Sequence, residues 1–540
     1  MDNKKIKIVS IISIIALALT LVAATYAYFV AQTGEGAQTD IKINANTVDT
    51  FTFEAGSALN LSLNQENFAS GKGNQRGTTF AKAMLSANNK TNTATEHYYL
   101  YLNISNNTFT YSIDNNTPEI LLSIKDGSNN EITSVSGLTY KTVTDGKGAS
   151  IKGFDITTKK GLVTILNNRE ITTTSTKTEQ WNVTVTFVNY NSNQAGNAGK
   201  NFSAKLMIQK EKIPTVLSDV CTNGNNLATC ITTLSNKSEP SIVNIYHHTS
   251  SLVNGAGDYS YRYAGASESV NNFVCFGSTT SPCPTDNLYR IIGVFGENNH
   301  GVTEKQLVKL IKYDYATSNL LGTDGDYNGS RTPGSTYKGS LTSINTYSWN
   351  YKNDTSINKG NGSNTWSTSL LNKTNLNTNF INNIGMTWSD LIEDTTWKVS
   401  GHTKTSVTPS VMYTAEITNA TKTYGPSDGT SKIGLMYASD YGFAASPSAW
   451  TKTLYDYSRD DANGTSIKTI NWMYMGFFEW TLRPISSNRI SVFYLNDSGA
   501  LFATGAANNG YGSRPVLYLK ASVLYAGGSG TKDSPITLVV

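Results

Sequence analysis

Apolar and polar residues alternate along much of the first 210 residues. The segment 181–190 (WNVTVTFVNY) is typical. Val183, Val185 and Phe187 fall on one face of an extended strand, and the threonines between them fall on the other. Such alternation is typical of strands that pack one face on a core. Turn-forming runs such as NN, DGSN and NAGK separate these segments, so residues 28–210 are predicted to form an antiparallel β-sandwich.

The pattern changes near residue 210. Residues 211–250 contain the best local helix signal and are expected to form a connector with a short helix. Further on, strand-length apolar runs such as NLYRIIGVFG and SRPVLYLKASVLYA are mixed with helix-like spacing of apolar residues in segment 365–385. This mixture predicts an α+β domain over residues 251–540.

The N-terminal segment has the features of an export signal. Three lysines within the first seven residues precede an uncharged apolar run over residues 8–24, and small residues follow at Thr25 and Ala27. A signal peptidase needs small side chains at that spacing. The run is about as short as a membrane span can be, so a cleaved signal over residues 1–27 is favoured over an anchor. Either way the lysines stay inside and the rest is expected outside the cell, with residues 8–24 contacting the membrane if uncleaved.

Composition narrows the class of protein. Charged residues make up 15% of the 540 residues, and 43 basic and 39 acidic groups give a net charge of +4. No basic tract or aromatic-rich basic patch occurs in the sequence, so nucleic acid is not an expected partner. Abundant Asn, Thr, Ser, Gly and Tyr suit β-rich extracellular proteins. A chain of this length exceeds a single core, so two or three domains are expected.

The cysteines all lie after residue 220, at Cys221, Cys230, Cys275 and Cys283. Outside the cell, such close pairs predict the disulfides Cys221–Cys230 and Cys275–Cys283. Four cysteines allow three pairings, and the sequence alone does not choose among them. A zinc site with neighbouring histidines is the competing interpretation, although zinc knuckles are built on shorter gaps.

A candidate calcium loop occurs in the segment DGDYNGSRTPGS. Asp324, Asp326 and Asn328 occupy its first, third and fifth positions, and Gly329 occupies the sixth. Alternate side chains of this kind converge on one hard cation in calcium loops. Ser335 stands where such a loop has its bidentate Glu, and a polar hairpin loop explains the same residues. No other cofactor is expected.

The segment ATYAYFVAQTGEGAQTDIKI resembles the export junction of the TasA/camelysin group of Gram-positive matrix proteins. Thr25, Tyr26, Ala27 and Phe29 match the small–aromatic–Ala site and the following aromatic residue of that group. The resemblance implies cleavage after Ala27 and a β-sandwich that self-associates by donating an N-terminal strand. The present chain departs from the group in its long C-terminal part.

The segments NWMYMGFFEWTLRP and GYGSRPVLYL resemble C-type-lectin-like domains of Gram-positive surface proteins, related in fold to formylglycine-generating enzymes. Trp480, Leu482 and Arg483 occupy the Trp-x-Leu-Arg segment of those domains, and Arg514 belongs to the final Gly-x-Arg-Pro strand. The resemblance implies a C-type-lectin-like fold for residues 251–540. Both arginines are expected to pair with acids such as Glu479 inside the fold.

The stretch between these two segments is the candidate ligand surface. It is rich in Asn, Ser, Tyr and Gly, which suit an adaptable contact surface. The candidate ligand-binding residues, all expected to be exposed, are Asn488, Arg489, Asn508, Asn509 and Tyr511. The expected partner is an extracellular glycan or protein. Two ordinary strands joined by an NDSG turn explain the same stretch equally well.

Motifs of known catalytic sites are missing from the sequence. It has no Gly-x-Ser-x-Gly, no His-Glu-x-x-His and no P-loop. A formylglycine-type oxidase needs reactive cysteines near its end, yet the last cysteine is Cys283. The five histidines lie in polar, loop-like stretches with no evident partner. The catalytic carboxylate pair of a glycosidase is recognised by its separation in the folded protein, not by its spacing in the sequence. A secreted glycan-active enzyme therefore stays as an alternative.

The sequence as a whole predicts a mainly β protein with an α+β C-terminal domain: a signal helix, an antiparallel β-sandwich and a C-type-lectin-like domain. The predicted function is non-enzymatic recognition or adhesion at the cell surface. The main alternative is an extracellular matrix or fibre subunit that self-associates through its sandwich.

We expect the exported protein to begin at or next to Tyr28, because Thr25 and Ala27 fit a signal peptidase. Mass spectrometry should give a mass that lacks residues 1–27. The variant Ala27→Trp, whose side chain is too large for that pocket, should keep the precursor mass. An intact Met1 on the native protein would contradict cleavage and indicate a membrane-anchored form.

Overall fold

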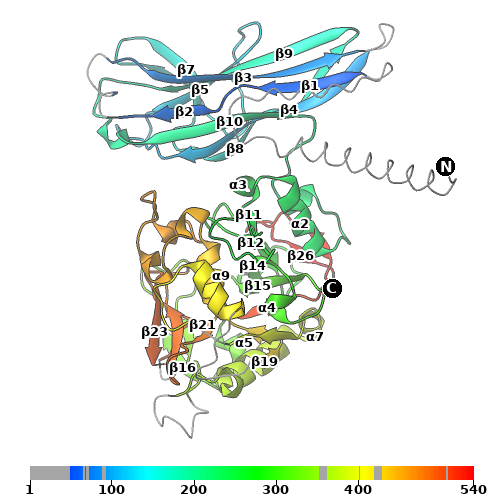
Figure 1. Cartoon of the computed structure of the whole chain (residues 1–540), viewed down its shortest axis with the longest axis vertical. Helices are drawn as coiled ribbons and strands as arrows, with labels where there is room; N and C mark the ends of the chain where they lie inside the picture. The colour runs from blue at the N-terminus through cyan, green and yellow to red at the C-terminus, as the bar shows by residue number, and fades with distance from the viewer. Residues whose placement is uncertain are drawn as a thin grey trace, which may run out of the picture. The chain divides into compact units, whose positions relative to one another are not determined.

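The computed structural model describes most of the chain after residue 48. The described residues are 49–540 apart from 65–66, 68–71, 88–92, 352–361, 400–401, 419–428 and 506–508. The predicted export signal lies outside them. The chain divides into two compact units, the first ending at Lys212 and the second spanning Ile213–Val540 (Figure 1).

The first unit consists of two antiparallel sheets. The larger has the strand order β1-β3-β9-β5-β7-β6, and the smaller has the order β2-β10-β4-β8. The strands are β1 (Thr50–Ala55), β2 (Leu59–Ser62), β3 (Gln75–Ser86), β4 (Ala94–Asn107), β5 (Ile120–Asp126), β6 (Tyr140–Thr144), β7 (Ser150–Asp155), β8 (Gly161–Thr173), β9 (Thr176–Phe187) and β10 (Asn201–Gln209). A short 3-10 helix, η2 (Ala195–Asn197), precedes β10.

One hydrophobic core lies between these two sheets. Val183, Val185 and Phe187 of β9 are fully buried in it, together with apolar side chains of β4 and β10 from the smaller sheet. Ile124 of β5 pairs with Val183 in register. The apolar face that the alternating pattern predicted is therefore the buried face, as expected for two sheets packed on one another. Figure 1 shows the two layers.

The second unit is built on a seven-stranded antiparallel sheet. Its order is β11-β12-β14-β15-β24-β20, with β13 paired to β14. These strands are β11 (Ile245–His247), β12 (Tyr261–Tyr263), β13 (Phe273–Cys275), β14 (Leu288–Phe295), β15 (Leu307–Lys312), β20 (Ile433–Gly434) and β24 (Val516–Tyr518). The apolar run NLYRIIGVFG forms β14, which pairs with β15, and the run that contains β24 is internal in the sheet, between β15 and β20.

Smaller strand groups surround that sheet. They are β16 (Tyr327–Arg331) with β17 (Ile344–Tyr347), β18 (Thr395–Trp397) with β19 (Gly429–Ser431), β25 (Tyr525–Gly527) with β26 (Thr537–Leu538), and the three-stranded sheet β21 (Glu479–Pro484), β22 (Ser491–Leu495) and β23 (Leu501–Gly505). The last of these lies within the predicted ligand surface.

The helices of the second unit are short. The α-helices are α2 (Leu227–Lys237), α3 (Pro240–Val243), α4 (Glu297–His300), α5 (Ser318–Leu321), α6 (Ile381–Ile384), α7 (Met386–Ser389), α8 (Pro409–Tyr413) and α9 (Ala438–Ala444). The π-helices are η6 (Leu371–Phe380) and η7 (Thr414–Thr418). The 3-10 helices are η3 (Leu217–Asp219), η4 (Thr285–Asn287), η5 (Trp366–Thr368), η8 (Pro447–Ala449), η9 (Leu454–Ser458) and η10 (Ile467–Thr469).

The segment expected to be a connector contributes to the core of the second unit. The side chain of Asn226 caps α2 by accepting a hydrogen bond from the Thr229 N–H at 3.1 Å. Leu227 and Ile231 on this helix are fully buried, and β11 joins the large sheet. No helix in the described part of the chain is long and apolar enough to cross a membrane.

The four cysteines form the two sequential disulfides that the sequence predicted. Cys221 is bonded to Cys230 and Cys275 to Cys283, with Cα–Cα distances of 5.5 and 5.8 Å. The first disulfide joins the loop before α2 to that helix, and the second closes the loop after β13.

Non-reducing peptide mapping should recover one crosslinked peptide for each of these pairs. Closing a loop this short contributes roughly 2–3 kcal/mol through the entropy of the unfolded chain. The double variant Cys275→Ala/Cys283→Ala should therefore lower the free energy of unfolding by about that amount. Free thiols, or a peptide joining Cys230 to Cys275, would contradict the pairing.

Candidate recognition surface

Three aromatic side chains form a line across the β21-β22-β23 sheet. Trp480 on β21 pairs with Tyr494 on β22, and Tyr494 pairs with Phe502 on β23. Residues directly opposite each other on neighbouring strands lie on the same face of a sheet. The rings of Tyr494 and Phe502 are accordingly 6.1 Å apart, and those of Trp480 and Tyr494 are 6.3 Å apart.

Three further aromatic side chains extend this line. The Tyr511 ring lies 4.4 Å from Trp480 and 4.8 Å from Tyr494, and Phe478 stacks on Tyr511 at 5.3 Å. Tyr455 of η9 lies 5.1 Å from Phe502. These ring separations fall within the favourable range for aromatic pairs. We call the whole set the aromatic row: Tyr455, Phe478, Trp480, Tyr494, Phe502 and Tyr511.

Exposure increases along the aromatic row. Trp480 is fully buried and donates its indole N–H to the carbonyl of Tyr347 at 2.6 Å. Phe478, Tyr494 and Phe502 are half-buried, while Tyr455 is 40% exposed. The row is therefore anchored in the core at Trp480 and exposes aromatic surface to solvent at Tyr455.

The predicted ligand-binding residues differ in their surroundings. Arg489 is exposed, as expected. Asn509 is half-buried and donates to the hydroxyl of Thr504 at 3.1 Å. Tyr511 was expected to be exposed, which is wrong: it is 8% exposed, because it packs within the aromatic row. Burial raises its pKa to about 12. Asn508 lies outside the described residues.

Asn488 has a structural partner in the turn between β21 and β22. Its carboxamide oxygen accepts the backbone N–H groups of Ile490 at 3.0 Å and Ser491 at 2.7 Å. Its backbone carbonyl accepts a hydrogen bond from Asn364 at 2.8 Å. The side chain is half-buried rather than exposed, so it shapes the turn that presents Arg489.

Arg483 and Arg514 are buried ion-pair partners, as the sequence predicted. Arg514 makes two hydrogen bonds to Glu479, at 2.7 and 3.0 Å. Arg483 pairs with Glu416 at 3.1 Å. Burial raises the pKa of both Glu479 and Glu416. These arginines therefore belong to the framework below the aromatic row.

The candidate calcium residues have separate partners. Asp324 is exposed and accepts from Asn379 at 2.7 Å. Asp326 is fully buried and accepts the N–H of Leu371 at 3.3 Å, while Asn328 donates to Ser348 at 2.8 Å. Of these three, only Asn328 is close to the ligand segment: a Cβ at Gly510 would lie 2.9 Å from its side chain. Calcium binding by this loop stays a prediction.

Sequence reasoning missed a buried cluster of charges beside the large sheet. Lys309 contacts Asp440 at 2.6 Å, and Arg262 contacts Asp258 at 2.8 Å and Asp440 at 3.6 Å. Each side chain is at most 5% exposed. Burial lowers the pKa of Lys309. The spacing of these residues along the chain gave no signal, because they come from three separate parts of it: the segment at β12, β15 and α9.

Two of the histidines are not in polar surroundings, which corrects the expectation for them. His248 and His300 are fully buried; His248 accepts the backbone N–H of Ala256 at 3.0 Å. His97 lies 3.6 Å from Glu170 on the neighbouring strand. Among the described residues, no group of three or more His, Cys, Asp or Glu is placed to bind a metal ion.

No known protein family matches the chain. No curated protein matches it in sequence either. The resemblances to the TasA/camelysin group and to C-type-lectin-like domains therefore stay predictions that depend on the quoted motifs alone.

The variant Asn488→Ala should lower the free energy of unfolding by about 1 kcal/mol, because two backbone N–H groups lose their acceptor. Arg489→Ala is the matched control, since its side chain is exposed one residue away. It should change stability by less than about 0.5 kcal/mol. Chemical denaturation of both variants measures the difference; equal effects would contradict the turn role of Asn488.

Proposed function

We propose that this chain is an exported, non-enzymatic protein of the cell surface that recognises a carbohydrate through its aromatic row. The observation that supports this proposal is the gradient of exposure from buried Trp480 to exposed Tyr455 along contacting rings. Aromatic rings offer the apolar C–H face of a sugar a large contact area, and they lose little entropy on binding.

Preorganisation of the row supports the same function. Tyr455 packs on Phe502, which is fixed opposite Tyr494 by strand pairing. Side chains already locked by packing cost less free energy to order on binding.

The finer predictions about fold and location belong to this proposal. The second unit is proposed to be C-type-lectin-like, on the motif around Trp480 and Arg514. Export is supported by the sequence of residues 1–27 and by two disulfides, which persist in oxidising compartments. A ligand that is a protein rather than a glycan would use the same aromatic surface.

The variant Tyr455→Ala should weaken glycan binding by about tenfold or more, because it removes the most exposed ring of the row. Its melting temperature should stay close to that of the native protein. The matched control is Tyr259→Ala, a 59% exposed tyrosine whose ring meets that of His247 edge-on instead; it should bind as the native protein does.

The mature full chain is first screened on a glycan array. Calorimetry then measures the affinity of the native protein and of both variants for each glycan found. Unchanged affinity in Tyr455→Ala for every glycan found would sink the assignment of the aromatic row. An array and a host-protein screen without any hit would contradict recognition as the function.

A second candidate function, a matrix or fibre subunit, is favoured by the edge strand β1. Within the described residues β1 pairs with β3 on one side only, and an edge strand can accept a strand from another copy. Ordered assembly of the purified mature chain would favour this function. Monomeric behaviour together with glycan binding would favour recognition.

A further inference from the structure

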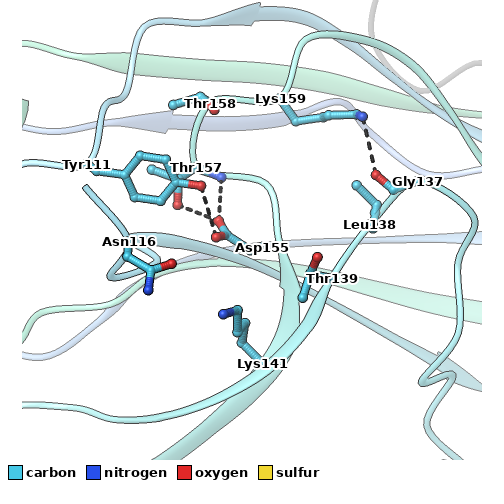
Figure 2. A pocket seen from close by; sticks show the side chains of 10 residues that line it. All are labelled: Tyr111, Asn116, Gly137, Leu138, Thr139, Lys141, Asp155, Thr157, Thr158 and Lys159. Carbon is cyan, nitrogen blue, oxygen red and sulfur yellow. Dashed lines mark hydrogen bonds between the residues drawn. The ribbon is translucent and has the colours of Figure 1, made fainter. Parts of the chain in front are cut away.

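The first unit contains a polar cavity that neither the sequence motifs nor the proposed function uses. Its volume is about 270 Å³, and four segments meet around it: the β4–β5 and β5–β6 connections, β6 itself and the β7–β8 turn. Figure 2 shows Tyr111, Asn116 and Lys141 around the carboxylate of Asp155. The polar side chains that line it are Tyr111, Asn116, Thr139, Lys141, Asp155, Thr157, Thr158 and Lys159.

The wall formed by the β7–β8 turn is held from inside the unit. The buried side chain of Asn107 donates to three backbone carbonyls of this turn, those of Ile156, Thr157 and Lys159, at 2.9–3.1 Å. The Thr157 hydroxyl oxygen in turn accepts the N–H of Glu119 at 2.9 Å. The cavity is therefore formed before any ligand arrives, as most small-molecule sites are.

The wall opposite is fixed in the same manner. Asp114 accepts the backbone N–H of Asn116 at 2.8 Å and the Thr117 hydroxyl at 2.8 Å. The Asn116 side chain is exposed and lines the cavity. Lys159 donates to the carbonyl of Gly137 at 3.4 Å, which joins the turn to the β5–β6 connection (Figure 2).

The charge in the cavity favours an anion. Lys141 and Lys159 bring two ammonium groups, and neither has an acid within ion-pair distance among the described residues. The one carboxylate, Asp155, already accepts the Tyr111 hydroxyl at 3.0 Å and the N–H and hydroxyl of Thr157 at 3.0 and 2.7 Å. These donors occupy its oxygens, and the two lysines outnumber this one acid, so the net formal charge of the lining is positive.

We infer that this cavity binds a small polyhydroxylated anion, such as a single uronic-acid or phosphorylated sugar unit. Its volume lies just below the range of about 300–1,000 Å³ for drug-sized ligands, so it fits a ligand of about one ring. The two lysines would hold the carboxylate or phosphate, and Asn116 with the exposed hydroxyls of Thr139 and Thr158 would bind the ring hydroxyls. This site belongs to the first unit and does not depend on the aromatic row.

Calorimetric titration of the mature full chain with galacturonate, glucose 6-phosphate and glucose tests the inference. One or both anions should bind, and glucose should bind at least tenfold more weakly. Lys141→Gln and Lys159→Gln should each weaken anion binding by about tenfold, because each loses a charge-assisted contact. Lys160→Gln is the matched control: this exposed neighbour of Lys159 is not part of the lining.

The two anions differ in their charged group. Tighter binding of galacturonate would indicate a carboxylate ligand, and tighter binding of glucose 6-phosphate would indicate a phosphate ligand. The absence of binding to both would overturn the inference, as would equal binding of glucose or retained affinity in both lysine variants. Thermal unfolding of each variant checks that the fold is intact. Tyr455→Ala should leave anion binding unchanged, so failure at this cavity and failure of the aromatic row are separate outcomes.

Discussion

The buried ion pair between Arg514 and Glu479 fixes the geometry on which the candidate surface of the second unit depends. Glu479 begins β21, the strand that carries Trp480, and Arg514 stands just before β24 of the large sheet. Both are at most 2% exposed, so neither charge can be satisfied by water. Removing one partner of such a pair typically costs about 3–5 kcal/mol. The pair therefore couples the sheet of the aromatic row to the main sheet, and Arg514 also donates to the carbonyl of Met473 at 2.8 Å.

The same constraint recurs elsewhere in this unit. Glu416 accepts the backbone N–H groups of Ala438 and Ser439 at 3.1 Å, at the start of α9, and it pairs with Arg483 of β21. Lys309 of β15 meets Asp440 of α9. A chain with few charged residues thus places several of them inside, where each acts as a connector between elements because it must find an opposite charge. A small share of charged residues in the sequence is therefore compatible with several charged side chains in the interior.

Sequence patterns predicted the features that depend on residues close together in the chain. Alternation of apolar and polar residues predicted the strands, because the side-chain period of two decides which face is buried. The short spacing of the cysteines favoured the two sequential disulfides. Tyr511 was misjudged, because its burial depends on the register that places Tyr494 between Trp480 and Phe502. Asn488 looked like a ligand contact because the same side chain can cap a turn or bind a partner. The cavity of the first unit had no sequence signal, since four separated segments form it.

The two proposed sites would bind chemically different ligands, and a different structural feature positions the side chains of each. Cross-strand register supplies the aromatic row with rings in contact, which suits the apolar face of a ring ligand. Hydrogen bonds donated by Asn107 of β4 to the β7–β8 turn, and those accepted by Asp114 within the β4–β5 connection, give the cavity rigid polar walls, which suit charge and hydroxyls. The two proposed sites would therefore select different features of a ligand: apolar ring faces in the second unit, and charge with hydroxyls in the first.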